Sequence, residues 1–259
     1  MITAGIDLGT QSVKAVILKD GAVVSRGQAF SGFDPTKAAE QAVDEALKKA
    51  KLSLSDVEHV TATGSGMDMA PNANSTISMM GADAKAGVYL FPKARTIIDV
   101  GAEEARAVKC DDKGIMMDFV VNERCAAGAG AFIEAMARAL EVKLEEMGPL
   151  SLKAERASPI NATCVIFGES DVVPLIHRQE SKPEIARAIF DAMADRVSSM
   201  VHRLGVNPDV VLVGGVAKDV GFIASLKRKL GVDVLIPEYP EYAGALGAAL
   251  VAVNRVKKV

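Results

Sequence analysis

Apolar residues alternate with polar ones along the start of the chain, which predicts three short β-strands joined by tight turns. The second and third strands meet at Asp20-Gly21, a dipeptide that is typical of a hairpin turn. Over residues 34–51 the apolar spacing becomes helical, so that Ala38, Ala42 and Leu47 share one face. The chain therefore begins with a three-stranded meander followed by an amphipathic helix. The predicted strands cover residues 1–7, 12–19 and 22–30.

The same order of elements starts again near the middle of the chain. A strand at 57–63 and a helix at 75–88 close the first pattern, and a second meander begins at residue 96. Two such patterns predict two α/β lobes, because buried parallel strands need helices on their faces. The predicted elements of the second half are strands at 96–100, 105–110, 115–121, 209–213 and 232–236, and helices at 130–142, 166–178, 183–204, 220–230 and 243–256.

The two halves also share a sequence pattern. Asp7-Leu8-Gly9 aligns with Asp99-Val100-Gly101, and the same offset places Lys14 over Arg106. A meander followed by helices occurs twice along the chain. This repetition is typical of an α/β, two-lobed actin-like ATPase (ribonuclease H-like) fold with duplicated βββαβαβα lobes. We expect residues 1–94 plus about 243–259 to form the first lobe, and residues 95–242 to form the second.

The composition narrows the functional classes. Of the 259 residues, 49% are hydrophobic but only 4% are aromatic, so we expect an aliphatic core. The net charge is −3 and no basic stripe appears, which argues against a nucleic-acid partner. The apolar stretches are too short to span a bilayer, and no basic region or cleavage site opens the chain. We expect a cytoplasmic protein that does not associate with membranes.

The two Asp-x-Gly turns have the chemistry of a phosphate and metal clamp. Gly9 and Gly101 carry no Cβ, so that backbone N–H groups can approach a phosphate closely. Asp7 and Asp99 offer carboxylates to hydrated Mg²⁺, which needs few protein ligands. Ordinary hairpin turns are the alternative, and two matching copies argue against them. The predicted contacts to ATP or ADP are Gly9, Thr10, Gln11, Ser12, Lys14 and Gly101, with Gly214, Gly215 and Val216 beside the adenosine.

Two of the three cysteines have the positions of cluster or metal ligands. Cys125 and Cys164 each precede a predicted helix, whose N-terminus favours a thiolate. Iron–sulfur and zinc sites usually use four ligands, and a twofold dimer would supply the second pair. The alternative is that both are small buried hydrophobic side chains. Cys110 is expected to be an exposed residue at the tip of the second hairpin.

Five short motifs are spread over essentially the whole chain, and together they resemble the BadF/BadG/BcrA/BcrD ATPase family. This family includes activators of 2-hydroxyacyl-CoA dehydratases and ATPase subunits of benzoyl-CoA reductase. Its cysteine motifs are lacking in sugar kinases, actin and heat-shock ATPases. The motifs are Asp7-Leu8-Gly9-Thr10, Asp99-Val100-Gly101, Asn122 to Gly128, Thr163-Cys164 with Glu169-Ser170, and Gly214 to Ala217.

The resemblance implies an ATP-driven electron carrier. Two subunits would share one [4Fe-4S] cluster held by Cys125 and Cys164, and each would bind ATP with Mg²⁺ between its lobes, Gly128 included in the site. Hydrolysis would drive a low-potential electron into an iron–sulfur CoA-ester reductase or dehydratase component. The second subunit would be an identical chain or a related ATPase subunit, and ferredoxin or flavodoxin would supply the electron.

The second phosphate motif departs from that of the activators. They typically read Asp-Ile-Gly-Gly-Gln-Asp, whereas this chain has Ala102 and Glu103 after Gly101. We predict that Ala102 contacts the nucleotide and that Glu103 acts in catalysis, orienting water or binding Mg²⁺, although its charge would equally repel phosphate and slow hydrolysis. This departure, together with the run Ala127 to Phe132 after Cys125, favours benzoyl-CoA reductase as the partner over a 2-hydroxyacyl-CoA dehydratase. Two further alternatives are a small-molecule kinase of the same fold and a nucleotide-binding module with structural zinc.

Overall fold

The computed structural model describes residues 1–122, 130–157, 160 and 165–257. Contacts divide the chain into two compact units, and each unit contains most of one five-stranded sheet. The tip of the second hairpin, Cys110–Met117, groups with the first unit, whereas the expected boundary placed it in the second lobe. The first unit comprises Met1–Arg95, Cys110–Met117 and Glu241–Val259, and the second comprises Thr96–Lys109 and Asp118–Pro240.

The first sheet has the strand order β3-β2-β1-β4-β5. Its first three strands form the predicted antiparallel meander, and β4 and β5 run parallel to β1. The predicted helix at 75–88 is wrong at its start, because Ser75–Thr76 pair as a strand and Ser78 caps the helix by accepting from the Gly81 N–H. The elements are β1 (Ile2–Leu8), β2 (Ser12–Lys19), β3 (Ala22–Phe30), α1 (Pro35–Ala50), β4 (His59–Thr63), β5 (Ser75–Thr76), α2 (Met79–Leu90) and α8 (Ala243–Val256).

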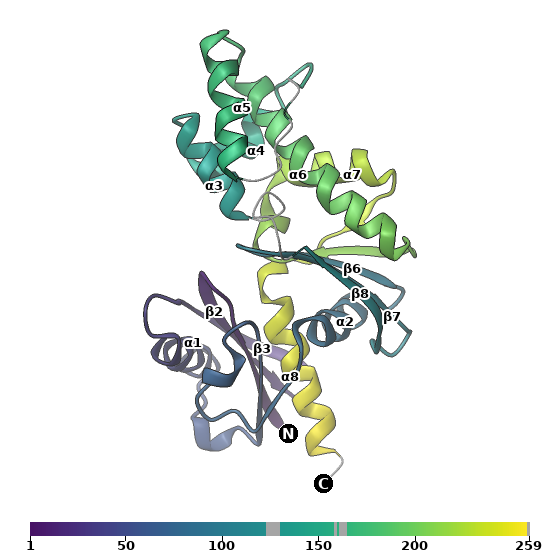
Figure 1. Ribbon diagram of the computed structural model, residues 1–259. Coiled ribbons are helices and arrows are strands. Elements are labelled where there is room, and N and C mark those ends of the chain that lie inside the picture. The colour runs from purple at the N-terminus through teal and green to yellow at the C-terminus, as the bar shows by residue number, and fades with distance from the viewer. Residues whose placement is uncertain (123–129, 158–159, 161–164, 258–259) are drawn as a thin grey trace. The chain divides into compact units, whose positions relative to one another are not determined.

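The alternation along β1 decides what packs on each face of this sheet. Ile6 and its neighbours two positions away join the apolar cluster formed with α1. Thr3 and Gly5 face α8, where the Thr3 hydroxyl donates to the Ala249 carbonyl at 3.3 Å and a Cβ at Gly5 would lie 2.0 Å from the Ala245 carbonyl oxygen. Helices α1 and α8 therefore cover opposite faces of the sheet (Figure 1).

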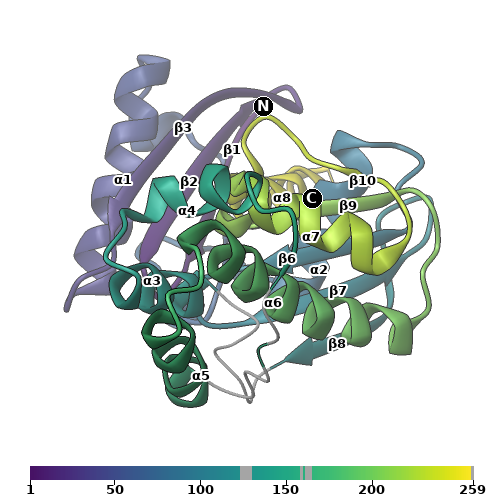
Figure 2. The ribbon, with the colours of Figure 1, turned by 90° about the horizontal axis from the view of Figure 1, so that it is seen from above.

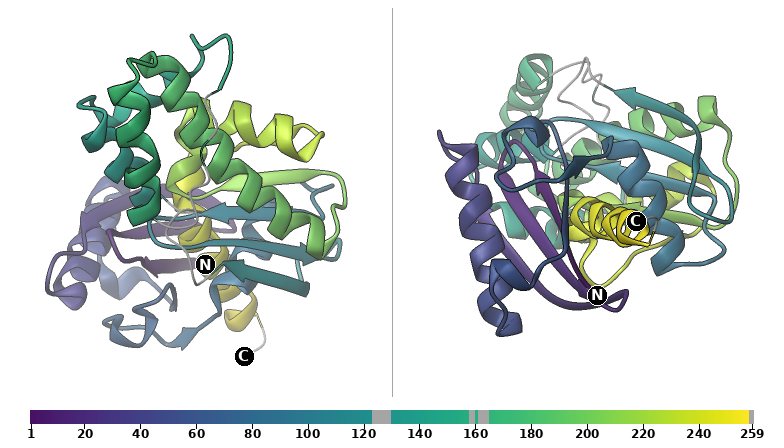
Figure 3. Two further views of the ribbon diagram at one scale, coloured as in Figure 1. Left: turned by 45° about the horizontal axis from the view of Figure 1, so that its top comes forward. Right: turned by 90° about the horizontal axis from the view of Figure 1, so that it is seen from below.

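Helix α8 also packs closely on α2 through a glycine. A Cβ at Gly247 would lie 1.9 Å from the Ala82 carbonyl oxygen, and Figure 3 shows the yellow helix α8 beside α2. We expect Gly247→Ala to destabilise the protein by about 3 kcal/mol, because the helices must separate to admit the methyl group. Asn254→Ala, at an exposed position of the same helix, is the control. Thermal unfolding measures both, and equal midpoints for the two variants would contradict the packing described.

The second sheet has the strand order β10-β9-β6-β7-β8 and repeats the meander and the parallel pairing of the first. Ile98, Val100 and Leu212 contribute to a large apolar core with α3, α6 and α7, and Figure 2 shows α6 and α7 lying along the sheet. The elements are β6 (Thr96–Val100), β7 (Ala105–Cys110), β8 (Met116–Asn122), α3 (Gly130–Ala139), α4 (Leu144–Ser151), α5 (Val165–His177), α6 (Lys182–Leu204), β9 (Val210–Val213), α7 (Val220–Leu230) and β10 (Val234–Leu235).

Helix α4 has no counterpart among the predicted elements. It contains Gly148 and Pro149, which the apolar pattern alone marks as a break. The helix is stabilised by packing, since Met147 is fully buried and a Cβ at Gly148 would lie 2.6 Å from Asp219 Oδ1 at the start of α7. Among the helices of the described ranges, none is both long and apolar enough to cross a bilayer.

Candidate functional site

The carboxylate of Asp7 lies between two glycine backbones at the end of β1. Parallel pairing places Asp7 beside Thr63, so the next residue, Gly64, turns away directly over the carboxylate. Gly64 has φ +94°, and a Cβ there would lie 2.6 Å from Asp7 Oδ1. A Cβ at Gly244 would lie 2.7 Å from Asp7 Oδ2. Since Gly244 is in the first turn of α8, the helix N-terminus stabilises the ionised carboxylate.

The turn that follows β1 is held by the end of β3. The Ser31 hydroxyl donates to the Gly9 carbonyl at 2.7 Å, and the Ser31 N–H donates to the Gln11 carbonyl at 3.0 Å. Lys14 donates from Nζ to the Ser12 carbonyl at 3.2 Å, which places its ammonium group beside the turn. Thr10 and Gln11 are exposed. The structure therefore gathers the predicted residues of the first turn around one exposed loop that carries a positive charge.

The second unit repeats this arrangement at Asp99. Parallel pairing of β6 with β9 places Asp99 beside Val213, and Gly214 follows with φ +90°. A Cβ at Gly214 would lie 2.2 Å from Asp99 Oδ1 and 2.4 Å from the Val100 carbonyl oxygen. In both units, a glycine with positive φ directly after the neighbouring parallel strand thus packs against the aspartate. The sequence analysis singled out the aspartates but missed this contact, and assigned Gly214 to the adenosine.

The aspartate of the second unit has a basic partner. Antiparallel pairing places Arg106 opposite Asp99, and its guanidinium pairs with Asp99 Oδ2 and with Glu104 Oε1. Asp99 is buried, and its Oδ1 has no hydrogen-bond partner among the described residues. Glu103, which the sequence analysis assigned to catalysis, is exposed. The acidic residue that joins this cluster is Glu104, which the repeat alignment gave no reason to select.

The second turn is bonded to the start of α3. The Gly101 N–H donates to the Glu104 carbonyl at 2.9 Å, and the Gly130 N–H donates to the Gly101 carbonyl at 2.9 Å. The Ala131 N–H continues this ladder to the Ala102 carbonyl at 2.8 Å. The predicted second-turn residues therefore lie beside the beginning of a helix, where the backbone dipole favours an anion.

The diglycine turn after β9 lies beside this helix start as well. A Cβ at Gly130 would lie 3.2 Å from Val216 Cγ2, which brings the predicted Val216 to the start of α3. A Cβ at Gly215 would meet nothing within 4 Å, so open space adjoins the turn at this residue. Within this turn Gly214 is closely packed and Gly215 is not, and the contact with adenosine stays a prediction.

The cysteine predictions have different outcomes. Cys125, Cys164 and the nearby Gly128 lie outside the described residues. Cys110 is buried, contrary to expectation, because it ends β7 and its Sγ lies 3.8 Å from the Ala94 carbonyl oxygen. Burial raises the pKa of the Cys110 thiol to about 11, so this thiol stays protonated and unreactive at neutral pH.

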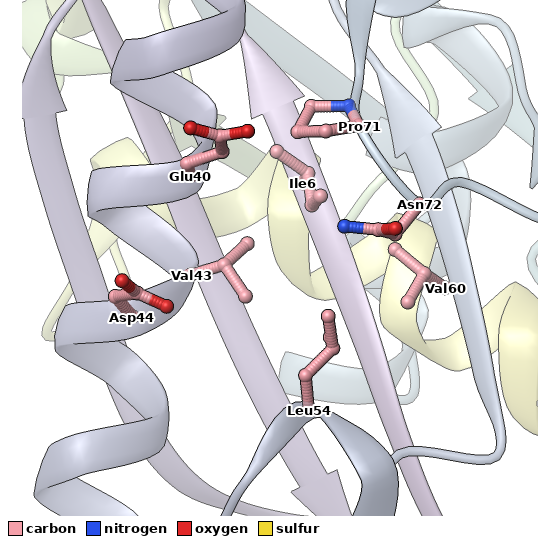
Figure 4. Close-up of a pocket in the computed structure, with 8 residues that line it drawn as sticks. All are labelled: Ile6, Glu40, Val43, Asp44, Leu54, Val60, Pro71 and Asn72. Atoms are coloured by element: carbon pink, nitrogen blue, oxygen red, sulfur yellow. The ribbon is translucent and has the colours of Figure 1, made fainter.

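A separate hollow in the first unit is too small for a nucleotide. It lies between α1, β1 and β4, and Figure 4 shows Glu40 and Asp44 on the helix beside the apolar side chains of Ile6 and Val60. Its volume is about 50 Å³, whereas ligand pockets typically measure roughly 300–1,000 Å³. Within the described ranges, no group of three His, Cys, Asp or Glu side chains is placed to hold a metal ion. The aspartate turn of each unit is the candidate for contact with a phosphate and its metal ion.

Comparison with known proteins gives full-length matches. The sequence model of the BadF/BadG/BcrA/BcrD ATPase family matches residues 4–252. The activator of lactoyl-CoA dehydratase from Anaerotignum propionicum is 38% identical over 258 residues, which is 100% of each chain. One of the subunits of benzoyl-CoA reductase from Thauera aromatica is 35% identical over 269 residues, covering 100% of this chain and 95% of the relative.

A solved structure supports the same relationship. The activator of 2-hydroxyisocaproyl-CoA dehydratase from Clostridium difficile, with bound ADPNP, matches with a TM-score of 0.93 at 35% identity. The match covers 100% of this chain and 96% of the activator. It confirms the predicted two-lobed α/β fold of the actin-like ATPase class.

Proposed function

The chain belongs to the BadF/BadG/BcrA/BcrD ATPase family, and from this premise we propose that it is an ATP-dependent activator of a 2-hydroxyacyl-CoA dehydratase. Two of the relatives described above are activators of such dehydratases by name. They favour this partner over the benzoyl-CoA reductase preferred from the second phosphate motif, although a reductase subunit is also similar.

The observation that carries the ATPase assignment is the repeated contact between aspartate and glycine. In each unit the carboxylate lies near the end of a strand, and the neighbouring parallel strand is followed directly by a glycine whose backbone leaves no room for a Cβ. Each unit thus holds a carboxylate beside a glycine turn, a combination that suits a polyphosphate with its metal ion. Ordinary hairpin turns would not require these matched glycines.

The residues of the second unit fit Mg²⁺. Asp99 Oδ1 is buried without a hydrogen-bond partner among the described residues, and a water bound to Mg²⁺ is a donor of the kind that it lacks. Mg²⁺ when bound would neutralise phosphate charge. Lys14 would add a positive charge at the first turn.

The electron-transfer part of the proposal is supported by the chemistry of the two cysteines. Cys125 and Cys164 provide thiolates, the ligands that iron–sulfur clusters use, and a second subunit would complete a set of four. A [4Fe-4S] cluster when bound would supply the low-potential electron. We propose a homodimer or a heterodimer with a related subunit, with ferredoxin or flavodoxin as the donor.

We expect Asp7→Asn and Asp99→Asn each to lower ATP hydrolysis by about a hundredfold, because each removes a charge that serves the metal and phosphates. Phosphate release at saturating ATP measures this effect, with iron content as a check that the cluster is retained. Asp112→Asn, at an exposed hairpin position, is the matched control. Undiminished hydrolysis in both aspartate variants would show that the phosphate site lies elsewhere.

A further inference from the structure

In the part of the second unit that the structure describes, the Arg106 guanidinium pairs with two carboxylates, those of Asp99 and Glu104. The Arg106 and Asp99 side chains are 9% and 8% exposed, whereas that of Glu104 is 32% exposed. A buried carboxylate that loses its only cation is strongly destabilised, so Asp99 depends on Arg106 when no other cation is present. Glu104 lies nearer to solvent and depends on Arg106 much less.

The two oxygens of Asp99 have different surroundings. Oδ2 pairs with Arg106, while Oδ1 lies against Gly214 and has no hydrogen-bond partner among the described residues. A buried acceptor without a donor costs free energy that a bound cation or its water would recover. Asp99 thus has one oxygen paired with Arg106 and one buried oxygen that lacks a donor among the described residues.

The equivalent position of the first unit does not share this arrangement. Lys14 occupies the same register opposite Asp7 that Arg106 occupies opposite Asp99. Its ammonium donates to the Ser12 carbonyl at the phosphate turn, whereas the Arg106 guanidinium bridges two carboxylates. Lys14 and Arg106 therefore align in sequence but make different contacts.

We propose that Arg106 is a positioning residue that competes with Mg²⁺ for Asp99, and that Glu104 receives its guanidinium when Asp99 turns to the metal. Arg106 holds the Asp99 carboxylate in place before the nucleotide binds. Because Glu104 already contacts the same guanidinium, the exchange of partners needs only a small movement of the side chain. This inference rests on the proposed function, since it requires that the chain binds ATP with Mg²⁺.

The competition is measured as the Mg²⁺ dependence of nucleotide affinity. A non-hydrolysable ATP analogue is titrated into the full-length protein by calorimetry, with and without Mg²⁺, and the ratio of the Kd without Mg²⁺ to the Kd with Mg²⁺ is compared between variants. Removing the competitor in Arg106→Met is expected to raise this ratio by about tenfold, the value of one charge-assisted hydrogen bond. Glu104→Gln is expected to lower the ratio by a similar factor, because the ionised carboxylate that would receive the Arg106 guanidinium is removed.

Two further variants control the test. Arg228→Met removes an exposed guanidinium that pairs with Asp191 in the same unit, and it is expected to leave the ratio unchanged. Arg106→Lys keeps the charge but loses the forked geometry, and it is expected to give an intermediate rise. If Arg106→Met does not fold, the Mg²⁺ ratios of Arg106→Lys and Glu104→Gln test the competition instead.

The outcomes separate the inference from the proposed function. A wild-type chain that binds no analogue would overturn both. A wild-type chain that binds the analogue, with the same Mg²⁺ ratio in the Arg106 and Glu104 variants, would overturn the competition and leave the ATPase assignment intact. A purely structural role for Arg106 would weaken binding equally with and without Mg²⁺, and opposite shifts of the ratio in the Arg106 and Glu104 variants would establish the exchange.

Discussion

Gly214→Ala is expected to destabilise the second unit by about 3 kcal/mol, lowering the thermal midpoint by about 8 °C, and to abolish nucleotide binding. The added Cβ would lie 2.2 Å from Asp99 Oδ1 and 2.4 Å from the Val100 carbonyl oxygen, at a residue whose φ is +90°. Strain and steric overlap therefore coincide at this one position. The carboxylate cannot keep its place once β9 or β6 shifts to admit the methyl group.

Thermal unfolding followed by circular dichroism measures the stability, and calorimetry with the ATP analogue measures the binding. The matched control for stability is Gly215→Ala, because its Cβ meets nothing within 4 Å and its φ is not in the positive range. Gly64→Ala is expected to repeat the loss in the first unit, where the Cβ would lie 2.6 Å from Asp7 Oδ1. A Gly214→Ala protein as stable as Gly215→Ala would refute the contact between glycine and aspartate.

Replacing either proposed cluster ligand is expected to remove the iron entirely. Cys125→Ala and Cys164→Ala each take away two of four thiolates in a symmetric dimer, which leaves too few ligands for a cubane cluster. The dimer is expected to loosen while each chain stays folded, because the cores of both units are built from other residues. Iron analysis, gel filtration and circular dichroism measure the three properties.

Cys110→Ala is the matched control for these variants. Its thiol is buried against the Ala94 carbonyl, and burial raises its pKa, so it is not available as a thiolate ligand. It is expected to keep full iron content. Iron retained in both Cys125→Ala and Cys164→Ala would remove the basis for assigning the cluster to these cysteines.

The elements that follow a strong apolar period are predictable from the sequence alone. Helices α7 and α8 begin and end at the predicted residues, because Asp219 caps the first and small residues run unbroken through the second. Helix α4 is not predictable in this way, since packing against the start of α7 offsets the cost of Gly148 and Pro149. Local pattern thus predicts elements well where tertiary packing does not override it.

The sequence predicts which residues form the candidate site better than it predicts which of them contact one another. The repeat identifies Asp7 and Asp99, but the glycines pressed against them come from strands far along the chain, and only the sheet register brings them together. The pairing of Arg106 with Asp99 follows from the same register. The contact of Arg106 with both Asp99 and Glu104 was not predictable from the repeat, because the repeat suggests that Arg106 acts like Lys14. A register argument applied to β6 and β7 would have found this pair.

The central claim is that this ATPase carries an electron on a cluster shared by two chains. The metal and acid-labile sulfide content of the anaerobically purified protein tests it most directly. The account predicts a brown, oxygen-sensitive protein with iron and sulfide in equal amounts, corresponding to one [4Fe-4S] cluster for each pair of subunits. Stoichiometric zinc in a colourless protein would contradict it.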